Sequence, residues 1–380
     1  MKTEVLQPGL KYLQLIGLWG ERPRPVYRYY VGIATEIVCM FIPMLVFGPG
    51  EEGFDSFACY LAQLIFLGEV AVSFLLFHSQ ARSFEKMVAI LGEIVERLDR
   101  KDTQDGVRKF ITSSEKFGRK YNVYVWLVLG TFFNVPLIFS FVTLLTKPES
   151  ERSDFARILM MKFYWLDTRR NIVHYGIYWT LLYLACIFSS FQSVLKVTVV
   201  STVIEYGSKM FEFISQKIKH LEKIADDKER RQELREVLEI HQLTLKYAAL
   251  LESSLSYLLL DMLSCCMLML CLMMYYLSTT FGPNALSIII LLTFSTLEMA
   301  YFCFGGNKLS DKAAEVAESM YAYAWYAEPV DIQKDILFAI ARSQQLTGIT
   351  AARFYYVNRE RFAIIIQASY SYYLILKSAF

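Results

Sequence analysis

The sequence predicts an all-α, polytopic membrane protein with seven transmembrane helices, a cytoplasmic amino terminus and a cytoplasmic helical domain. Three observations lead to this fold class. Hydrophobic residues make up 55% of the 380 residues and charged residues 20%, which is more apolar than an ordinary soluble domain. Seven stretches come close to the roughly 20 apolar residues that a helix needs to cross a bilayer. Lysine and arginine are concentrated in alternate connections between these stretches.

The apolar stretches also predict the organisation of the chain. The seven spans are expected at 26–47, 54–77, 121–145, 173–200, 255–277, 285–304 and 362–376. The segments that follow from them are an amino-terminal part (1–25), the first four spans (26–200) with an inner loop (78–120) and an outer loop (146–172), extensions of spans four and five (201–254), spans five and six (255–304), cytoplasmic helices (305–357) and a last helix (358–380). We find no internal repeat that divides the chain further.

The basic residues predict the orientation of the chain. The inner loop holds Arg82, Lys86, Arg97, Arg100, Lys101, Arg108, Lys109, Lys116, Arg119 and Lys120. The connection between spans four and five holds Lys209, Lys217, Lys219, Lys223, Lys228, Arg230, Arg231, Arg235 and Lys246. The outer loop conflicts with this pattern, because it holds Lys147, Arg152, Arg157, Lys162, Arg169 and Arg170. The other connections agree with one another, so we expect the amino terminus in the cytoplasm.

Amphipathic patterns predict helices outside the spans. Residues Leu10 to Trp19 are apolar enough for a short interfacial helix. The inner loop repeats apolar residues at steps of three and four, at Phe84, Met87, Val88, Leu91, Ile94, Val95 and Leu98. The same stepping from Val203 to Tyr247 predicts that helices four and five continue into the cytoplasm as a hairpin, and a third such segment follows span six. The apolar faces of these helices either pack together within a monomer or bind other subunits, and we favour oligomerisation.

The carboxyl-terminal third carries a recognisable set of residues. They are Gly306, Leu309, Ser310, Tyr321, Trp325, Tyr326, Arg342, Ser343, Gln344, Gln345, Leu346, Thr347, Ala351, Ser369, Tyr370, Ser371, Tyr372 and Leu376. Together with the chain length and the inverted topology, this pattern resembles the insect odorant receptor family. The match is specific over about the last 80 residues, and before them it is limited to the arrangement of the spans.

The resemblance implies an odorant-gated, non-selective cation channel in the plasma membrane of olfactory sensory neurons. Members of the family form tetramers through the cytoplasmic helices, called the anchor domain, and line one pore with the last span. Most are tuning subunits that work beside a shared coreceptor, whose long insertion in the second inner loop is absent from the compact loop 202–250 here. A tuning subunit of a heterotetramer is therefore implied. The interface residues expected in the anchor domain are Tyr321, Trp325, Tyr326 and Leu337.

The partners implied are the coreceptor subunit, a small volatile odorant, monovalent and divalent cations that permeate, and the lipid bilayer. No cofactor is expected. The net charge of +2 gives no basis for a nucleic-acid partner. The related gustatory receptors are the alternative within the superfamily: their last span ends in Thr-Tyr, five apolar residues and Gln-Phe, which Ser371 and Tyr372 match loosely, whereas Lys377, Ser378 and Ala379 break the rest.

The same resemblance places the channel gate near Ile375. Ser378 and Ala379 lie one helical turn beyond it, and Ser371 lies one turn deeper. An apolar ring at a narrow pore blocks ions by dewetting. The alternative is that these are ordinary packing positions. Lys377 beside a cation pore is unusual, and we expect its charge to lie among the lipid headgroups.

The family's odorant site lies in the outer half of the bundle, between spans two, three, four and six. The residues at those depths are Tyr60, Leu64, Leu67, Leu129, Phe132, Phe133, Pro136, His174, Tyr175, Tyr178, Trp179, Leu182, Ile288, Leu292 and Ser295. This aromatic set with few polar groups favours a small apolar ligand, with flat rings stacking on Tyr178 or Trp179. Alternatively, the aromatic residues face lipid. The segment Phe155 to Trp165 either covers this site as a lid or lies on the membrane surface.

Charged residues inside the predicted spans are further candidates for function. They are Glu36, Glu69, Lys196, Asp261 and Glu298. A charge in hydrocarbon costs about 3 kcal/mol or more, so these side chains are expected to face the bundle interior, a water path or a partner. A structural pair of Lys196 with Asp261 or Glu298 is the alternative to a functional role.

Other classes of function fit the sequence less well. The four histidines, His78, His174, His220 and His241, lie apart without metal-ligand spacing, so we expect no enzyme. A G-protein-coupled receptor would invert the basic-loop pattern and would usually carry an outer-loop cysteine, whereas all seven cysteines here fall within predicted spans. A transporter would be expected to show paired broken helices, and we find only isolated prolines.

Overall fold

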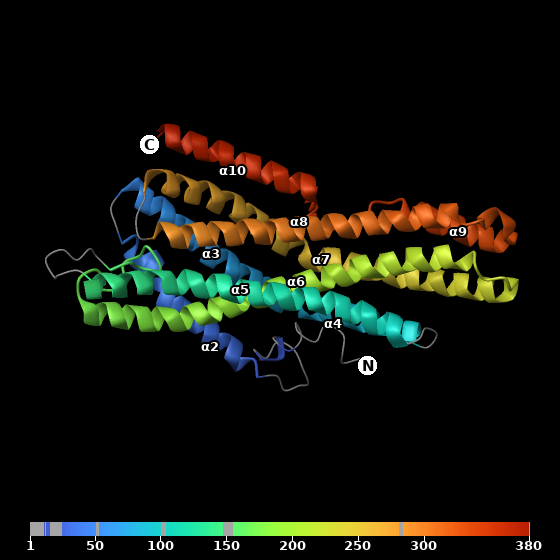
Figure 1. Ribbon diagram of the computed structural model, residues 1–380, viewed down its shortest axis with the longest axis horizontal. Helices are drawn as coiled ribbons and strands as arrows, with labels where there is room; N and C mark the ends of the chain where they lie inside the picture. Colours follow the sequence, from blue (N-terminus) through green and yellow to red (C-terminus); the bar gives the residue numbers. More distant parts are fainter. Residues whose placement is uncertain are drawn as a thin grey trace.

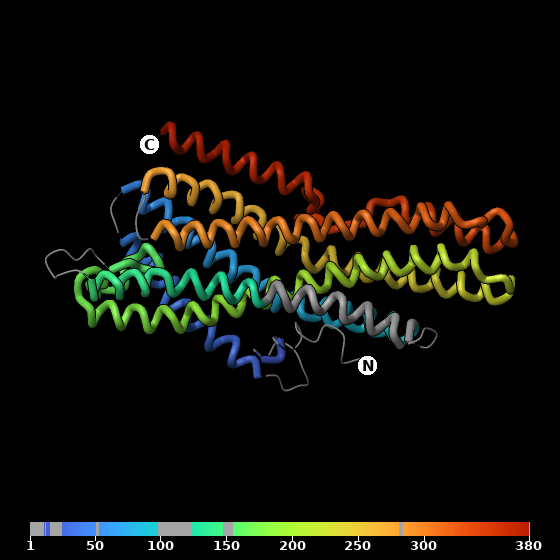
Figure 2. The backbone as a smooth tube through the Cα atoms, viewed as in Figure 1, coloured from blue at the N-terminus to red at the C-terminus, as the bar shows by residue number. Residues whose placement is uncertain are grey.

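The computed structural model describes residues 11, 13–15, 25–50, 53–99, 104–146, 155–280 and 284–379. Long helices run side by side in an elongated bundle, and the last helix diverges from it (Figure 1). The segment 155–171 folds across one end of the bundle, which we call the lid end. The opposite end, which we call the hairpin end, carries the turn between the two longest helices (Figure 2). The interfacial helix expected over Leu10 to Trp19 lies mostly outside the described residues.

Almost all of the regular structure is helical. The elements are α2 (Tyr27–Glu36), η1 (Ile37–Phe41), η2 (Pro43–Phe47), α3 (Phe54–Ser79), α4 (Ala81–Asp99), α5 (Gln104–Thr146), α6 (Ile172–Leu221), α7 (Asp227–Thr279), α8 (Ala285–Ala322), η4 (Trp325–Ala327), α9 (Val330–Ser343), β1 (Thr350–Ala351), β2 (Tyr355–Tyr356) and α10 (Arg359–Ala379). The all-α prediction is confirmed.

Among the described residues, six segments are long and apolar enough to cross a membrane. They are Tyr27–Phe47, Phe54–Ser79, Val123–Thr146, Ile172–Leu221, Asp227–Thr279 and Ala285–Ala322. They coincide with the first six predicted spans. The seventh predicted span falls in α10, whose 21 residues include Gln367, Ser369, Ser371 and Lys377 and are therefore less apolar. That α10 crosses the membrane stays a prediction.

The first membrane-length segment changes its winding around Pro43. The α-helical turns of α2 pass into the π-helical turns of η1 and η2 on either side of this proline. Proline has no backbone N–H, and its ring crowds the carbonyl four residues earlier, so an α-helix is strained at that point. Wider π turns relieve this crowding. Met40 and Met44 are buried on the inner face of this segment.

The predicted amphipathic helix of the inner loop is present as α4. Its apolar stripe is buried, and comprises Phe84, Met87, Leu91, Ile94 and Val95. The stripe joins a core cluster that also contains residues of α6, α7, α8 and α9. The helices that the sequence predicts outside the spans therefore bury a large part of their apolar faces against one another within one chain. This is the arrangement that the sequence analysis gave as the alternative to oligomerisation.

The two longest helices form the predicted hairpin. α6 has 50 residues and α7 has 53, which correspond to about 75 to 80 Å at 1.5 Å per residue. A membrane core is about 30 Å thick, so each helix extends far beyond it. Asn171 caps α6 by accepting hydrogen bonds from the backbone N–H groups of Val173 and His174, and Asp226 caps α7 by accepting one from Lys228.

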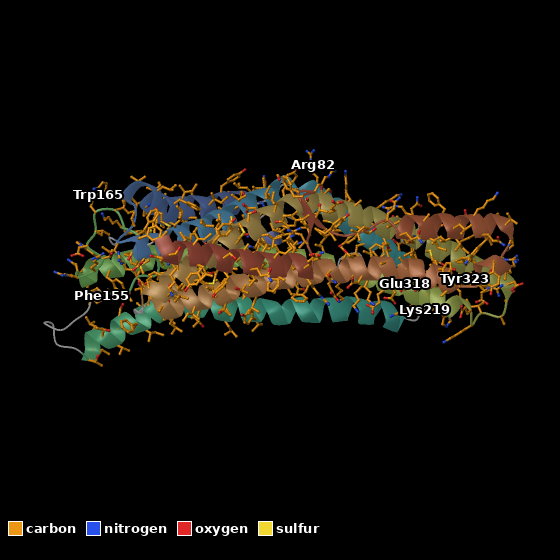
Figure 3. All side chains as sticks on the ribbon, turned by 90° about the horizontal axis from the view of Figure 1, so that it is seen from above. Arg82, Phe155, Trp165, Lys219, Glu318 and Tyr323 are labelled. Atoms are coloured by element: carbon orange, nitrogen blue, oxygen red, sulfur yellow. The ribbon has the colours of Figure 1, made fainter. Side chains whose placement is uncertain are left out.

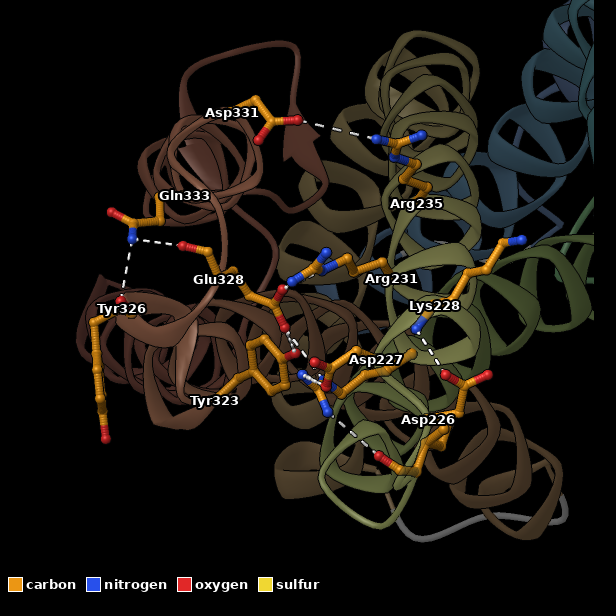
Figure 4. A network of polar contacts seen from close by, with 12 residues as sticks. Asp226, Asp227, Lys228, Arg231, Arg235, Tyr323, Tyr326, Glu328, Asp331 and Gln333 are labelled. Atoms are coloured by element: carbon orange, nitrogen blue, oxygen red, sulfur yellow. Dashed lines mark hydrogen bonds and ion pairs between the residues drawn. The ribbon is translucent and has the colours of Figure 1, made fainter.

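A buried carboxylate joins the hairpin to the connection between α8 and α9 (Figure 4). Glu328, whose side chain is 2% exposed, accepts hydrogen bonds from Arg230 at 3.2 Å, from Arg231 at 3.1 Å and from the Tyr323 hydroxyl at 2.6 Å. Burial alone would raise the pKa of Glu328, but the hydrogen bonds from Tyr323 and the two arginines outweigh it and hold this pKa below its ordinary value. Glu328 therefore stabilises the hairpin end as an anion.

Close backbone packing connects α8 to the last helix. β1 and β2 form a short hairpin after α9, and Val357, just beyond β2, lies against Gly306 of α8. A Cβ atom at Gly306 would stand 2.3 Å from the Val357 carbonyl oxygen, so any larger residue would push the two apart. α10 begins at Arg359, and of its side chains only Ile365 and Ser369 are buried against the bundle.

We predict that Glu328→Gln lowers the stability of the hairpin end. Losing a buried charge that accepts three hydrogen bonds should cost about 2 kcal/mol at neutral pH. Because the folded-state pKa is lowered, this contribution is complete above the unfolded-state pKa and disappears as the pH falls through the folded-state value. Thermal unfolding of the purified protein in detergent, at several pH values, measures it.

Asp331→Asn is the matched control, because Asp331 and Arg235 are both exposed and lie 4.0 Å apart. Such a pair contributes less than about 1 kcal/mol. Equal effects of the two substitutions at neutral pH would contradict the role given to Glu328.

Candidate functional site

The segment 155–171 closes the lid end of the bundle. Figure 3 shows Phe155 and Trp165 at this end, and Lys219, Glu318 and Tyr323 toward the other. The backbone of the segment is irregular, and residues 158–161 and 163 are almost fully buried in the core cluster of this end. The segment therefore lies on the bundle as a lid, which was one of the two arrangements expected from the sequence.

Two buried polar side chains bind the backbone of this lid. The Gln63 amide of α3 donates to the carbonyl of Ile158 at 3.2 Å, and its oxygen accepts from the N–H of Met160 at 2.8 Å. The Tyr178 hydroxyl of α6 accepts from the N–H of Leu159 at 3.2 Å. An irregular segment inside an apolar core needs such partners, because an unpaired buried N–H or C=O group is costly. These contacts fix the lid to α3 and α6.

Arginines of the lid bind backbone carbonyls, one within the lid and one in the neighbouring connection between η2 and α3. Arg157 is 4% exposed and donates to the Met161 carbonyl at 3.3 Å, and Arg169 donates to the carbonyl of Gly50. Pro49 pairs with Met161 in an isolated antiparallel bridge. These basic residues of the outer loop were in conflict with the charge pattern of the other loops. Their contacts give them a structural role that does not depend on which side of the membrane they occupy.

A small enclosed cavity lies beneath the lid. Its volume is about 20 Å³, which is room for about one water molecule. The lining residues come from η1, α3, α5, the lid, α6 and α8. They are Met40, Gln63, Phe66, Leu67, Leu129, Phe132, Phe133, Leu159, Cys186, Ser189, Ser190, Ser193 and Leu291.

Four of the residues predicted for the odorant site line this cavity, namely Leu67, Leu129, Phe132 and Phe133. The other eleven do not line it. Those that are buried are Tyr60, Pro136, Tyr175, Tyr178, Leu182, Ile288 and Ser295, and those that are partly buried are Leu64, His174, Trp179 and Leu292. The structure thus brings the predicted set to one end of the bundle.

The aromatic residues proposed for stacking make other contacts. The Tyr178 ring packs edge-on against Phe163 of the lid, with centroids 5.2 Å apart. The Trp179 ring stacks on Tyr183 at 4.7 Å. At the mouth of the site, His174 accepts a hydrogen bond through Nδ1 from the N–H of Asp167 at 3.2 Å. Each of these rings is therefore held by protein neighbours.

Sequence reasoning missed the polar wall of the cavity. Cys186, Ser189, Ser190 and Ser193 follow one another on α6 at steps of three, one and three, which puts them on one helical face. Small side chains at such spacing in an apolar helix were the signal that could have identified this wall. Ser189 donates to the Glu36 carboxylate of α2, and Gln192 donates to the same carboxylate at 3.2 Å.

A charged cluster lies one turn of α6 further from the lid. The Lys196 ammonium is 2.8 Å from a carboxylate oxygen of Glu69 on α3 and 2.8 Å from one of Glu298 on α8. Ser73 donates a further hydrogen bond to Glu69 at 2.9 Å. The expected pair of Lys196 with Glu298 is confirmed. The pair with Asp261 is not among the ion pairs of the described residues, and Glu69 takes that place.

The residues predicted for the gate and for the subunit interface lie at the surface of the chain. Ile375 is 59% exposed, and Ser371, Ser378 and Ala379 are exposed on the same helix. Lys377 stands beside the Tyr373 ring, 5.9 Å from its centroid. Around η4 and α9, the exposed interface candidates are Tyr321, Tyr326 and Leu337, while Trp325 packs partly against the core.

Comparison with known proteins identifies the family. Residues 57–370 match the family model described as 7tm odorant receptor. The chain belongs to the insect odorant receptor family. It is therefore a membrane protein of a receptor family, as the six membrane-length helices among its described residues also indicate.

Individual relatives match over shorter segments. Odorant receptor Or2 of Anopheles gambiae is 30% identical over 155 residues, which cover 39% of each chain. Odorant receptor 10 of Aedes albopictus is 26% identical over 114 residues, or 30% of each chain. The odorant receptor coreceptor of Drosophila melanogaster is 24% identical over 92 residues, which are 24% of this chain and 19% of the coreceptor. The matched regions span less than half the length of these relatives.

The fold likeness extends over the whole chain. The structure of the olfactory receptor OR5 from the insect Machilis hrabei in complex with eugenol superposes with a TM-score of 0.75 at 16% identity, covering 99% of this chain and 98% of that one. The structure of the same receptor described without a ligand gives 0.73 at 17% identity, covering 98% and 97%. These receptors and the chain described here share one fold.

We predict that Lys196→Met strongly destabilises the bundle. It would leave two buried carboxylates beside each other without their cation, which should cost about 3 to 5 kcal/mol. Thermal unfolding in detergent measures the loss, and adding Glu69→Gln and Glu298→Gln to the same chain should restore most of it.

Lys209→Met on the same helix is the control, because Lys209 pairs with Glu212 in a partly exposed position. Its loss should stay below about 1 kcal/mol. If the Lys196→Met and Lys209→Met proteins unfold at the same temperature, the charged cluster does not stabilise the bundle.

Proposed function

We propose that this chain is the odorant-binding tuning subunit of a heteromeric, odorant-gated, non-selective cation channel that it forms with the odorant coreceptor. The observation that carries the proposal is the enclosed, mostly apolar cavity beneath the lid, between α3, α5, α6 and α8. Ligand sites for small molecules are concave and mostly apolar, with few polar groups. The fold likeness to a receptor described with bound eugenol, a small aromatic molecule, agrees with this ligand class.

In the proposed channel the amino terminus and the hairpin end lie in the cytoplasm, and the lid faces outside. The channel belongs in the plasma membrane of olfactory sensory neurons. α10 is the seventh span and lines the pore with Ile375 at its gate, which accounts for the wide exposure of this helix in the isolated chain. Monovalent and divalent cations permeate.

The coreceptor is the proposed partner at two surfaces. One is the exposed flank of α10. The other is the anchor surface, which we define by Tyr321, Trp325, Tyr326 and Leu337, together with their exposed neighbour Phe338. The compact turn between α6 and α7, residues 222–226, supports a tuning role by the resemblance described above. Large exposed apolar residues at a helical end typically mark an interaction surface.

Odorant binding in this proposal requires the site to open. The cavity has a volume of about 20 Å³, which is smaller than any odorant. The odorant must therefore bind a conformation of the protein in which this cavity is larger. Leu159 belongs to the lid, and Gln63 holds the lid while also lining the cavity. An expanded cavity therefore requires that one or more of its walls move, and the lid and α8 are two of these walls. α8 leads from the cavity through Gly306 to the start of α10.

Current recording tests the proposed function. Cells that express this chain with the coreceptor should give inward currents with some members of an odorant panel. Leu67→Trp should raise the effective odorant concentration by about tenfold or more, because overpacking a closed site costs about 1 to 3 kcal/mol.

Leu75→Trp on the same helix is the control, because Leu75 is 55% exposed and the added ring has room. Its odorant response should stay within about twofold of the wild type. Silence across the panel with confirmed surface expression, or equal losses in both variants, would count against the proposed site.

Substitution at α10 tests the proposed gate. Ile375→Ser should produce current without odorant, because a polar ring no longer dewets a narrow pore. Leu374→Ser, one residue away and on a different face, should leave the resting current unchanged. Unaltered resting currents in the Ile375→Ser channel would remove Ile375 from the gate.

A further inference from the structure

Glu36 is a buried carboxylate whose partners are neutral. It is 4% exposed, and its hydrogen bonds come from the Ser189 hydroxyl and the Gln192 amide. Among the ion pairs of the described residues none involves Glu36, and the nearby buried Lys196 is held by Glu69 and Glu298. A carboxylate has about four lone-pair positions, so this side chain accepts fewer hydrogen bonds than it can.

An acceptor without a donor belongs to Gln192, one of the side chains that bind Glu36. The Gln192 side chain is 1% exposed, and its amide oxygen has no hydrogen-bond partner in the part of the chain that the structure describes. Buried polar atoms of this kind are rare in folded proteins and call for a specific explanation. The wall between α2 and α6 is therefore rich in acceptors and short of donors.

Ser189 connects this wall to the cavity. Its side chain lines the cavity, and its hydroxyl hydrogen is used within the protein, with the Glu36 carboxylate as the shortest contact and the Ala185 carbonyl at 3.3 Å and the Met40 sulfur at 3.7 Å as further acceptors. The hydroxyl oxygen keeps its lone pairs, and a hydrogen bond to a carboxylate polarises the hydroxyl so that this oxygen becomes a better acceptor. Toward the cavity, Ser189 therefore acts as an acceptor.

The two other serines of this wall also offer acceptors to the cavity. Ser190 donates to the Cys186 carbonyl at 2.7 Å, and Ser193 donates to the Ser189 carbonyl at 3.1 Å, so both hydroxyl hydrogens are used within α6. The Gln63 amide is engaged by the lid backbone at both its nitrogen and its oxygen. The polar wall on α6 thus offers acceptors to whatever occupies the cavity.

We infer that the cavity selects molecules that carry a neutral hydrogen-bond donor, such as an alcohol or phenol, over molecules of the same shape that only accept, with Ser189, backed by Glu36, as the residue that orients the donor. This inference rests on the proposed function. A neutral hydroxyl fits better than an ammonium group, because the remaining walls include Phe66, Phe132 and Leu291 and would not replace the water around a charge.

Matched sets of odorants test the inference in cells that express this chain with the coreceptor. Each set has a primary alcohol, the corresponding aldehyde and a hydrocarbon of equal heavy-atom count. One set is aromatic (2-phenylethanol, phenylacetaldehyde and propylbenzene), and one is aliphatic (1-octanol, octanal and nonane). We compare compounds within the set to which the channel responds more strongly. In that set, the alcohol should act at a concentration about tenfold lower than the aldehyde.

Aldehydes or hydrocarbons that act as well as the alcohols overturn the inference while the proposed function stands. Silence to both sets and to the full odorant panel overturns the proposed function and the inference with it.

Two substitutions on the same wall separate this role from a structural one. Ser189→Ala should raise the effective concentration of the alcohol about tenfold and leave that of the aldehyde unchanged. Ser190→Ala is the comparison on the same wall, since Ser190 lines the cavity without contacting Glu36, and it should reduce the preference for the alcohol less than Ser189→Ala does. Equal effects of the two substitutions, or a loss in Ser189→Ala that is the same for all three compounds, overturn the role of Ser189.

A further variant isolates the contribution of the charge behind Ser189. Glu36→Gln keeps an acceptor oxygen at this position but removes the negative charge that polarises the Ser189 hydroxyl. It should reduce the preference for the alcohol in the same direction as Ser189→Ala and by a smaller factor. An unchanged or increased preference in a Glu36→Gln channel that reaches the cell surface overturns the part assigned to Glu36.

Discussion

Hydrocarbon cannot hydrogen-bond, and this constraint governs how the bundle is built. A polar group inside the membrane-length helices must find its partner within the protein. Lys196 is therefore shared by Glu69 and Glu298, which come from two other helices, so that one ammonium group fixes the relative positions of α3, α6 and α8. The serines of α6 meet the same requirement locally, by donating to carbonyls four residues earlier.

The same requirement explains why the lid can be irregular. Its backbone lies in an apolar core without a helix or sheet to pair it, so side chains of the bundle supply the missing partners. Gln63 is suited to this task, because one amide can both donate and accept along an extended backbone. The lid is consequently attached to the helices that also line the cavity. A change at the cavity wall and a change in the lid are thus coupled through single side chains.

The positions of the helices could be predicted from the sequence, whereas the site could be predicted only in part. Hydropathy identifies the first six membrane-length segments, and the stepping of Phe84, Met87 and Leu91 identifies α4, because both signals are local. The rotation of each helix about its axis is a property of the whole bundle. Of the residues predicted for the odorant site, Leu67 and Phe132 thus line the cavity, while Tyr178 binds the lid. Gln63 and its backbone partners are nearly 100 residues apart in sequence, and no local pattern reveals such a contact.

α8 connects the parts of this arrangement along one face. Leu291 lines the cavity, Glu298 binds Lys196, and Gly306 touches the backbone of Val357 just before α10. These residues are seven and eight positions apart, so they lie on one stripe at intervals of about 10 to 12 Å. An α-helix bends little over such distances, and the ion pair holds α8 in its middle. In the proposed channel, one continuous helix therefore joins the cavity wall at Leu291, the ion pair at Glu298 and the contact of Gly306 with the segment that leads into α10.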